Sequence, residues 1–464
     1  MMISALGLRT RLLGASAAAA ILLASGASAQ SIADSMVTAF RSSPDLRAAR
    51  ANVELQSELA AIERAGNRPT ITGTAGIDVF FDEFDDVTYP TTLALTVTQA
   101  LYTGGQVENA VAAADTRTTA EQQLLLDTEQ TVLLNAVIAH ENVLQDQAFV
   151  ELGIKNLRVL SEQLRAARER FEVGEVTRTD VEQARAEVAA SRSSLASARG
   201  SLVASRESYK LVVGVLPGDL QEAPRLPDVP ATVEEAAAIA LTRDPVLRAA
   251  RLERDASGLD VRAAIGALLP QLELTASVQR LDTFDAAPTS QVDDDSGTVG
   301  LLLTLPFYTG GANYANVRAS QAAAEASVAG VTSAERSVVE EVATAYADLA
   351  VAEASIEAGI LEVEAAQLAF EGVSEEAKVG ARTTLDVLDA EAAVLDAQTD
   401  LVAAQRDKVV ATYTILASIG MMTVDHLGLA VAVPDTQPYV NTARERLFGY
   451  DSSEDTVWVS RWRP

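Results

Sequence analysis

The chain has 464 residues, with 65 Asp plus Glu against 36 Lys plus Arg, a formal net charge of −29, two His and no Cys. Such a charge repels the phosphate backbone that nucleic-acid-binding proteins contact through Lys and Arg. The lack of Cys excludes disulfides, thiolate chemistry, Cys-ligated metals and a lipid-modified N-terminal Cys. With no phosphate-binding Gly loop and no His-based acid–base group, we expect no enzyme, no cofactor, no metal site and no nucleic-acid partner.

The N-terminus has the pattern of a secretory signal peptide. Arg9 and Arg11 precede an apolar stretch over 12–24, and an Ala-Ser-Ala sequence at 27–29 matches a cleavage site. The alternative is a membrane anchor, but the apolar stretch is shorter than the roughly 20 residues that span a bilayer. We therefore expect residues 1–29 to be removed during export.

The remaining chain contains two copies of one plan. The segment 43–50 recurs at 244–251, and the Tyr-Thr-Gly-Gly sequence at 102–105 recurs at 308–311. Internal repetition of this kind indicates a duplicated structural unit. The predicted division is a signal peptide at 1–29, repeat 1 at 30–230 with a linker at 214–230, repeat 2 at 231–433, and a C-terminal tail at 434–464.

A very long Ala-rich stretch follows the Gly-Gly turn in each repeat. Ala, Leu, Glu, Gln and Arg are strong helix formers, and Pro is absent from 91–216 and from 307–433. A helix of about 65 residues would be a rod roughly 100 Å long. Because each rod meets a Val-Gly turn and then returns, the sequence predicts long helical hairpins over 106–213 and 312–418.

The segments before each Gly-Gly turn change their hydrophobic period from 3.6 to 2. The predicted strands lie at about 70–80, 91–100, 271–281 and 298–305. Their length and alternation are typical of transmembrane β-barrel strands, although soluble β-hairpins fit the pattern equally well. We expect the acidic segments 82–86 and 293–295 to lie in the connecting loops. Four strands cannot close a barrel in lipid, so a membrane location requires several copies, and three would supply twelve strands.

The second helical turn carries the strongest family signal. The sequence over 379–390 resembles the turn motif of the TolC-type outer-membrane efflux and secretion channel family almost position for position. Matching segments at 171–174, 179–181 and 305–311 extend the resemblance, which covers the mature chain through about Val433. It implies an α plus transmembrane β fold: a homotrimeric twelve-stranded barrel in the outer membrane, continued by a periplasmic barrel of twelve long helices.

The resemblance also implies a function and partners. The protein would be the exit duct of a tripartite efflux pump or a type I secretion system, gated at its periplasmic tip. Its partners would be outer-membrane lipid, a periplasmic adaptor (membrane fusion) protein and, through the adaptor, an inner-membrane transporter of the RND or ABC type. The transporter would set the cargo. A periplasmic or secreted coiled-coil scaffold without a pore is the alternative, but it would not explain the strand pairs.

Two acidic residues match the positions that line the pore constriction in this family. They are Asp386 and Asp389, and their i, i+3 spacing places both on one face of a helix. Asp386 also fits a capping box with Thr383, which would explain it without a pore. Asp389 has no such alternative, because its counterpart in the first repeat is Gln183.

A second group matches the family's gate latch between neighbouring helix pairs. The residues that the resemblance assigns to this latch are Arg382, Thr179, Asp180 and Gln163. A bidentate charged link of Arg to these partners would hold the tip closed. The sequence departs from the family at Ala377, where a Tyr is usual, and at Ser374, where an acidic partner of the glutamine is usual. These departures predict a weaker latch.

The two helical turns match the surface that docks on the adaptor. The implied contact residues are Val173, Gly174, Glu175, Lys378, Val379, Gly380 and Ala381. Glycine at a helix end is often required by a positive φ angle, and an exposed Lys is commonly only solvated. Their role as a binding surface therefore depends on the resemblance alone.

Overall fold

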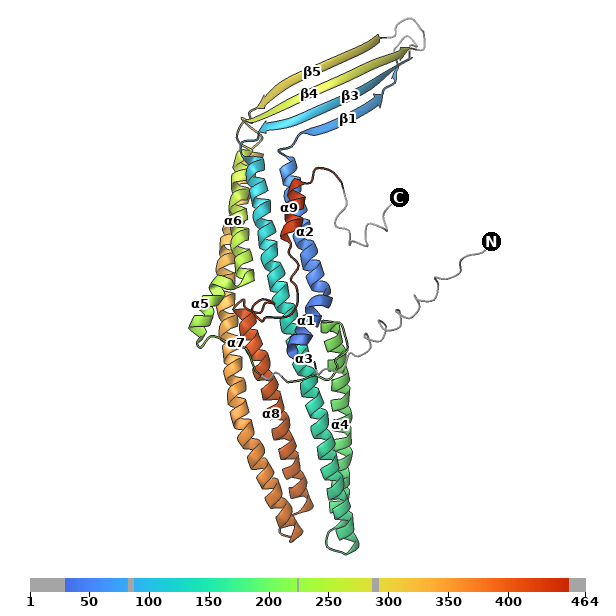
Figure 1. Ribbon diagram of the computed structural model, residues 1–464, viewed down its shortest axis with the longest axis vertical. Coiled ribbons are helices and arrows are strands. Elements are labelled where there is room, and N and C mark those ends of the chain that lie inside the picture. The colour runs from blue at the N-terminus through green and yellow to red at the C-terminus, as the bar shows by residue number, and fades with distance from the viewer. Residues whose placement is uncertain (1–29, 82–86, 223–224, 286–291, 450–464) are drawn as a thin grey trace, which may run out of the picture.

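The structure is a computed structural model that describes residues 30–81, 87–222, 225–285 and 292–449. The expected signal peptide, the acidic segment 82–86 and residues 450–464 lie outside these ranges. Figure 1 shows an elongated molecule with a β-sheet at one end and long helices running away from it to two hairpin turns. None of the described helices is long and apolar enough to cross a membrane.

The helices of the two repeats correspond one to one. Repeat 1 contains α1 (Ile32–Ser42), α2 (Pro44–Ala65), α3 (Gln106–Glu172) and α4 (Arg178–Val213). Repeat 2 contains α5 (Val233–Arg243), α6 (Pro245–Gly266), α7 (Ala312–Lys378) and α8 (Thr384–Ser418), and a last helix, α9 (Gln437–Glu445), follows. Both α2 and α6 begin at a Pro that directly follows an N-cap residue, Ser43 or Asp244. Proline suits this position because its fixed φ is helical and its missing N–H has no partner in the first turn.

Five strands form one antiparallel sheet. They are β1 (Thr70–Ile77), β2 (Phe80–Phe81), β3 (Val87–Tyr102), β4 (Gln271–Asp285) and β5 (Val292–Thr304). The order is β1-β3-β4-β5, and the short β2 pairs with β3. Each repeat thus supplies two long neighbouring strands, and the two repeats join where β3 pairs with β4.

Three of the long strands extend beyond the expected bounds. The expectation that 293–295 form a loop is wrong, because these residues belong to β5 and pair with residues 280–282 of β4. The alternation of apolar and polar residues predicts only the part of a strand that has an apolar face. Backbone hydrogen bonds continue the ladder through Asp residues, since N–H and C=O groups pair whatever the side chain is.

The helices lie side by side in a fixed order, both near the sheet and near the turns. Near the sheet the neighbours run α2, α3, α6, α7, and near the turns they run α4, α3, α8, α7. The end of α4 abuts α1 and the start of α2, where a Cβ on Gly214 would lie 2.7 Å from Ser42 Oγ. The end of α8 abuts the junction of α5 and α6, where a Cβ on Gly420 would lie 2.8 Å from the Arg243 carbonyl oxygen. One edge of the chain is therefore β1, α2 and α4, and the other is β5 and α7.

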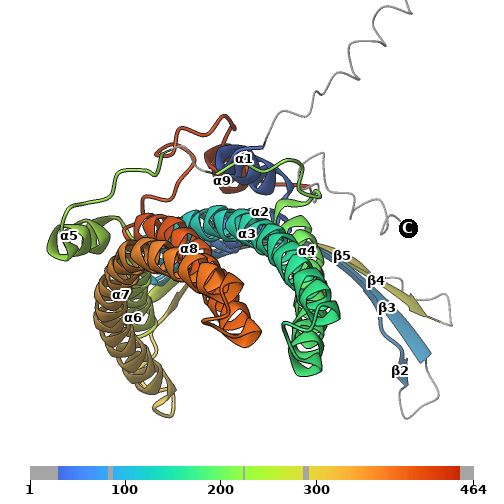
Figure 2. The same ribbon diagram turned by 90° about the horizontal axis from the view of Figure 1, so that it is seen from below.

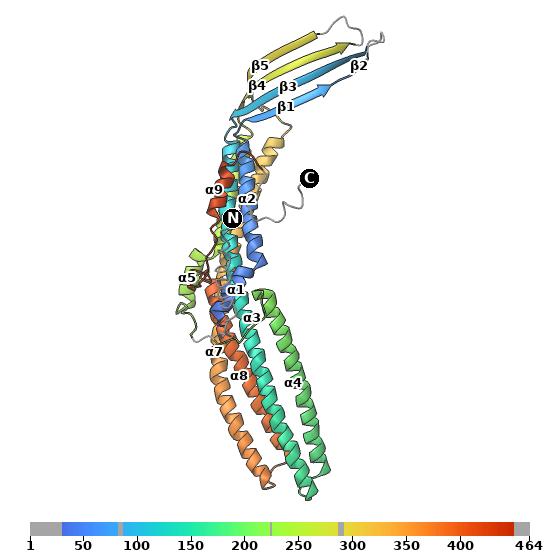
Figure 3. The same ribbon diagram turned by 45° about the vertical axis from the view of Figure 1, so that its right-hand side comes forward.

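Viewed along its length, the molecule is a curved wall one helix thick. Figure 2 shows α7, α8, α3 and α4 on an arc, with α1, α5 and α9 on its convex side, and Figure 3 shows α9 beside α2 below the sheet. The main apolar core lies where α1, α5 and the segment after α8 cover the convex side of the long helices. The hairpin ends extend beyond this core and are held by a smaller cluster.

A buried polar group lies inside the main core. The Ser35 hydroxyl is 2.8 Å from Nδ1 of His140 and 2.8 Å from the hydroxyl of Tyr209, and all three side chains are fully buried. The other ring nitrogen of His140 is 3.0 Å from the carbonyl oxygen of Gln221 in the linker. Burial lowers the pKa of His140, so the neutral ring is favoured. These contacts give His140 a structural role.

Candidate functional site

The two hairpin turns at the far end of the helices have the same backbone. Gly174 has φ +82° and Gly380 has φ +76°, a region that favours glycine because it has no Cβ. The amide of each glycine donates to the carbonyl three residues earlier, and the next amide donates to the carbonyl five residues earlier. These bonds satisfy carbonyls at the end of α3 and α7. The turns leave Val173 71% exposed and Val379 81% exposed at the extreme tip.

A capping box starts the return helix in both hairpins. The Thr383 amide donates to Oδ2 of Asp386 at 2.9 Å, and the Asp386 amide donates back to the Thr383 hydroxyl at 3.2 Å. Thr177 and Asp180 repeat this arrangement at the start of α4. Hydrogen bonds from Thr383 hold the pKa of Asp386 below its ordinary value, so its charge is stabilised. Asp389 lies one turn further along α8 with its side chain exposed.

Arg382 is paired inside its own hairpin. Its Nε donates to Oε2 of Glu376 at 2.9 Å, across the turn between α7 and α8. The first hairpin has an ion pair in the same place with the charges reversed, since Arg170 lies 4.0 Å from Glu175. Glu376 is a residue that the sequence reasoning missed as a partner. The signal was available, because both turns are flanked by opposite charges five or six residues apart.

The structure brings some of the expected latch residues together. Gln163 and Ser374 line one cavity of about 260 Å³ between the hairpins, and Ala377 lines it too. Nη1 of Arg170 donates to the carbonyl oxygen of Ala377 at 3.4 Å, which links α3 to α7. Asp180, by contrast, bonds with Thr177 of its own capping box. An apolar cluster completes the contact between the hairpins: Leu160, Ala167, Ala184, Val188 and Leu388.

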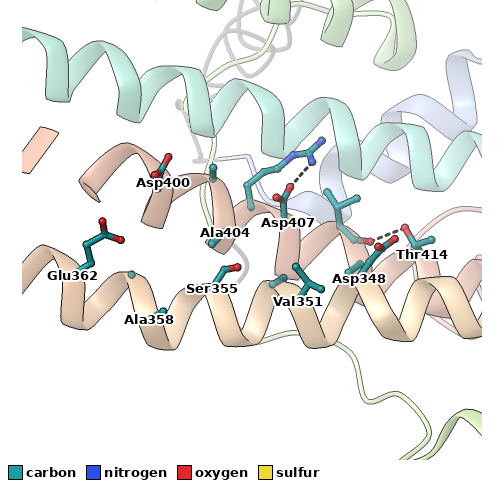
Figure 4. A pocket seen from close by; sticks show the side chains of 15 residues that line it. Asp348, Val351, Ser355, Ala358, Glu362, Asp400, Ala404, Asp407 and Thr414 are labelled. Atoms are coloured by element: carbon teal, nitrogen blue, oxygen red, sulfur yellow. Dashed lines mark hydrogen bonds and ion pairs between the residues drawn. The ribbon is translucent and has the colours of Figure 1, made fainter. Parts of the chain in front are cut away.

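A groove further along the second hairpin is strongly acidic. It has a volume of about 600 Å³ and lies between α7 and α8. Figure 4 shows Asp348, Glu362, Asp400 and Asp407 on its walls. Its one basic lining residue, Arg406, pairs with Asp407 at 2.7 Å and also bonds to an Asn of α3. Among the described residues, no group of three or more His, Asp or Glu is arranged to hold a metal ion. The hairpin therefore presents a diffuse negative field, which attracts cations.

These features define a class of protein. A sheet of four long strands and the short β2, with β1 and β5 at its edges, is joined to a curved wall of helices that ends in paired tips. The strands are of the length that spans a membrane, and the helices reach about 100 Å beyond them, because α3 and α7 each contain 67 residues. A chain of this kind is a subunit of an outer-membrane channel with a long periplasmic extension.

Comparison with known proteins identifies the family. The sequence matches the outer membrane efflux protein family over residues 36–215 and 237–421. It is 37% identical to outer membrane efflux protein BepC of Brucella suis over 92% of this chain and 94% of that protein. It is 29% identical to outer membrane protein TolC of Escherichia coli over 56% of each chain. The chain belongs to the outer membrane efflux protein family.

Solved structures agree with this assignment at the level of the fold. The structure of CusC superimposes with a TM-score of 0.76 at 19% identity, over 84% of this chain and 92% of that one. The resemblance, the fold class, the efflux-channel function and the outer-membrane location expected from the sequence are thereby confirmed. Most of the chain lies in the periplasm. Because the relatives are channels, the scaffold alternative is set aside.

Proposed function

We propose that three copies of this chain form one exit duct that is gated at its periplasmic tip. The unchanging lateral order of the elements supports a head-to-tail ring. In such a ring, β1, α2 and α4 of one copy meet β5 and α7 of the next, so every unpaired strand edge gains a partner. Lipid tolerates no unpaired strand edge, and three copies supply the twelve strands of a closed barrel.

Asp386 and Asp389 are proposed to form two acidic rings at the narrowest point. They lie on one face at the start of α8, and α7 and α8 carry the more acidic of the two hairpins. Threefold repetition would place six carboxylates around one axis, where their fields add and favour cations over anions. The low pKa of Asp386 keeps its ring charged at neutral pH.

Ion selectivity in a planar bilayer tests this assignment. The double variant Asp386→Asn with Asp389→Asn should bring the ratio of cation to anion permeability close to that of a neutral pore. Glu182→Gln with Glu187→Gln removes the same charge from exposed positions on α4 and serves as the matched control. Cation preference that survives the tip substitutions, or falls equally in the control, would show that other residues form the constriction.

Arg382 is proposed to act in the latch that keeps the tip closed. Within one chain it already ties the turn of the second hairpin to α7 through Glu376. In the trimer, Thr179 and Asp180 of a neighbouring first hairpin are the proposed further partners, and Gln163 belongs to the adjoining contact. Arg382→Ala should raise single-channel conductance, whereas Arg178→Ala, an exposed Arg at the other tip, should not. Equal conductance in both variants would remove Arg382 from the latch.

The two exposed turns are proposed as the docking surface for a periplasmic adaptor, which would connect the duct to an inner-membrane transporter. Val173 and Val379 support this role, because both turns present an exposed apolar side chain at the extreme tip, where a partner can contact it. Glu175, Lys378 and Ala381 flank them. Because the chain has no Cys, Val379→Cys provides a single site for crosslinking in cells. A crosslinked partner that is periplasmic and membrane-anchored is expected, and an equal product from an exposed mid-helix Cys would contradict the proposal.

A tripartite efflux pump is the favoured setting. The main support for an efflux role is that the chain belongs to the efflux family and is 37% identical to a relative named as an efflux protein. Deletion of the gene should therefore increase sensitivity to small toxic compounds, and secretion of proteins should be unchanged. The opposite pattern would favour type I secretion.

A further inference from the structure

The last described segment of the chain is fastened to the outside of the wall. α9 lies along α2, with Val440 and Ala443 buried between the two helices. The hydroxyl of Tyr439 donates to Oε1 of Glu58 at 3.0 Å, and Arg444 lies 3.6 Å from Asp115 of α3. Figure 2 shows α9 on the convex side, away from the interior of the arc.

The end of α9 is held at the height where the sheet begins. Arg68 donates from Nη2 to the carbonyl oxygen of Arg444 at 2.9 Å and from Nη1 to that of Arg446 at 3.2 Å. Arg68 lies two residues before Thr70, the first residue of β1. The chain therefore leaves α9 directly below the base of the sheet. In an outer-membrane channel, this level is the periplasmic surface of the membrane.

The next two residues are apolar, and most of each side chain is exposed. Leu447 is 66% exposed and Phe448 is 92% exposed. Adjacent exposed apolar side chains mark an interaction site, and aromatic residues are enriched where a membrane meets water. The two side chains therefore lie at the level where the lipid of the outer membrane offers an apolar environment.

We propose that Leu447 and Phe448 insert into the phospholipid headgroup and acyl boundary of the periplasmic leaflet. Leu447 and Phe448 then form an interfacial foot, and α9 with Arg68 sets the height of these two residues. The foot supplies an apolar contact at this surface. The competing occupant is the neighbouring copy, whose exposed Phe307 and Tyr308 also lie at the base of the sheet.

Tryptophan quenching by lipid tests the proposal at residue 448 itself. In a background with Trp458→Phe and Trp462→Phe, Phe448→Trp places the only Trp at the proposed contact. The full chain is reconstituted in phosphatidylcholine vesicles, with or without bromine atoms near the top of the acyl chains. Quenching should be several-fold stronger than in the matched control Val173→Trp, which is 71% exposed at the far tip. Quenching no stronger than in the control overturns the proposal.

A second measurement decides between lipid and the neighbouring copy. Phe448→Cys with Tyr308→Cys is oxidised in the trimer, where no native Cys interferes. Little intersubunit crosslinking is expected, because lipid and not the neighbouring copy surrounds Phe448. Efficient crosslinking would assign Phe448 to the subunit interface and overturn the proposal.

Discussion

The two long hairpins share one backbone and differ in charge. α3 and α7 have 67 residues each, α4 has 36 and α8 has 35. Residues 106–213 nevertheless contain 12 Lys plus Arg and 16 Asp plus Glu, a net charge of −4, whereas residues 312–418 contain 6 and 18, a net charge of −12. Helix length, turn and cap depend on a few local residues, so the remaining surface was free to diverge after duplication. The acidic hairpin is the one proposed to line the constriction.

The same contrast appears in the central core. Ser35, His140 and Tyr209 form the hydrogen-bonded group of repeat 1, and the corresponding residues of repeat 2 are Ala236, Tyr346 and Ile415. Ala236 and Ile415 are fully buried, and the Tyr346 hydroxyl donates to the carbonyl oxygen of Pro230 at 2.7 Å. Either solution is stable, because a buried polar group costs little once each of its polar atoms has a partner. His140 and Tyr346 both hold the linker.

Among equivalent substitutions in the two repeats, those at the Gly-Gly turns should differ most in their effect on stability. A Cβ on Gly104 would lie 2.5 Å from the carbonyl oxygen of Gly266, while a Cβ on Gly310 would meet open space. Both glycines have positive φ, so either Ala substitution costs about 1–2 kcal/mol. Gly104→Ala adds a backbone clash of about 1–3 kcal/mol, and should lower the thermal unfolding temperature far more than Gly310→Ala. Equal shifts would mean that the close packing of α6 on this turn is not maintained.

A buried acid of repeat 1 should make stability depend on pH. Glu141 is 5% exposed, and burial, with a smaller effect from Glu222, raises its pKa to about 7. The folded state therefore keeps the proton between about pH 4.5 and 7 while the unfolded chain loses it, so stability falls as pH rises through this window. Glu141→Gln should stabilise the protein by about 2–3 kcal/mol above pH 7 and have little effect near pH 4.

Denaturant unfolding at both pH values measures this effect. The corresponding residue of repeat 2 is Ala347, so the substitution makes the repeats more alike. A gain that is the same at both pH values would mean that folding does not raise the pKa of Glu141.

The two capping boxes should contribute equally to the stability of the return helices. Thr177→Ala and Thr383→Ala each remove the side chain that accepts from the third amide of the return helix, at about 1 kcal/mol. Hydrogen exchange at the first turn of α4 or α8 detects this local loss. In repeat 2 the contribution of Asp386 is present above its unfolded pKa of about 4 and is lost as pH falls through its lower folded pKa. Exchange that increases at one tip only would show that the two caps are not equivalent.

The smallest expected difference concerns two equivalent glycines inside the long helices. A Cβ on Gly153 would lie 3.3 Å from Cδ1 of Leu195, and a Cβ on Gly359 would lie 3.5 Å from Cδ1 of Leu401. Alanine gains up to about 1 kcal/mol over glycine in a helix. Gly359→Ala should therefore stabilise the protein slightly, and Gly153→Ala should do so less because Leu195 must shift. Calorimetry on both variants makes the comparison, and a clear loss at Gly359 would contradict it.

Much of the fold follows from local rules that can be read in the sequence. The long helices follow from uninterrupted helix formers, and their turns follow from glycines that take positive φ at 174 and 380. The ends of β5 could not be placed this way, because its polar part has no apolar alternation and depends on pairing with β4. The same limit applies to the site. Asp386 and Asp389 share a face by spacing alone, but the partner of Arg382 depends on how the turn folds back on α7.

The sequence by itself determined the duplicated plan, the helix-hairpin character and the family, because these depend on composition, periodicity and short motifs. Only the tertiary structure decided which elements form the two edges of the chain, how α4 and α8 continue α2 and α6, and where α9 holds the C-terminal segment. The physical reason is that such contacts join residues far apart in sequence, as between Arg68 and the carbonyl of Arg446. Their geometry depends on the packing of the whole wall, and no local pattern encodes it.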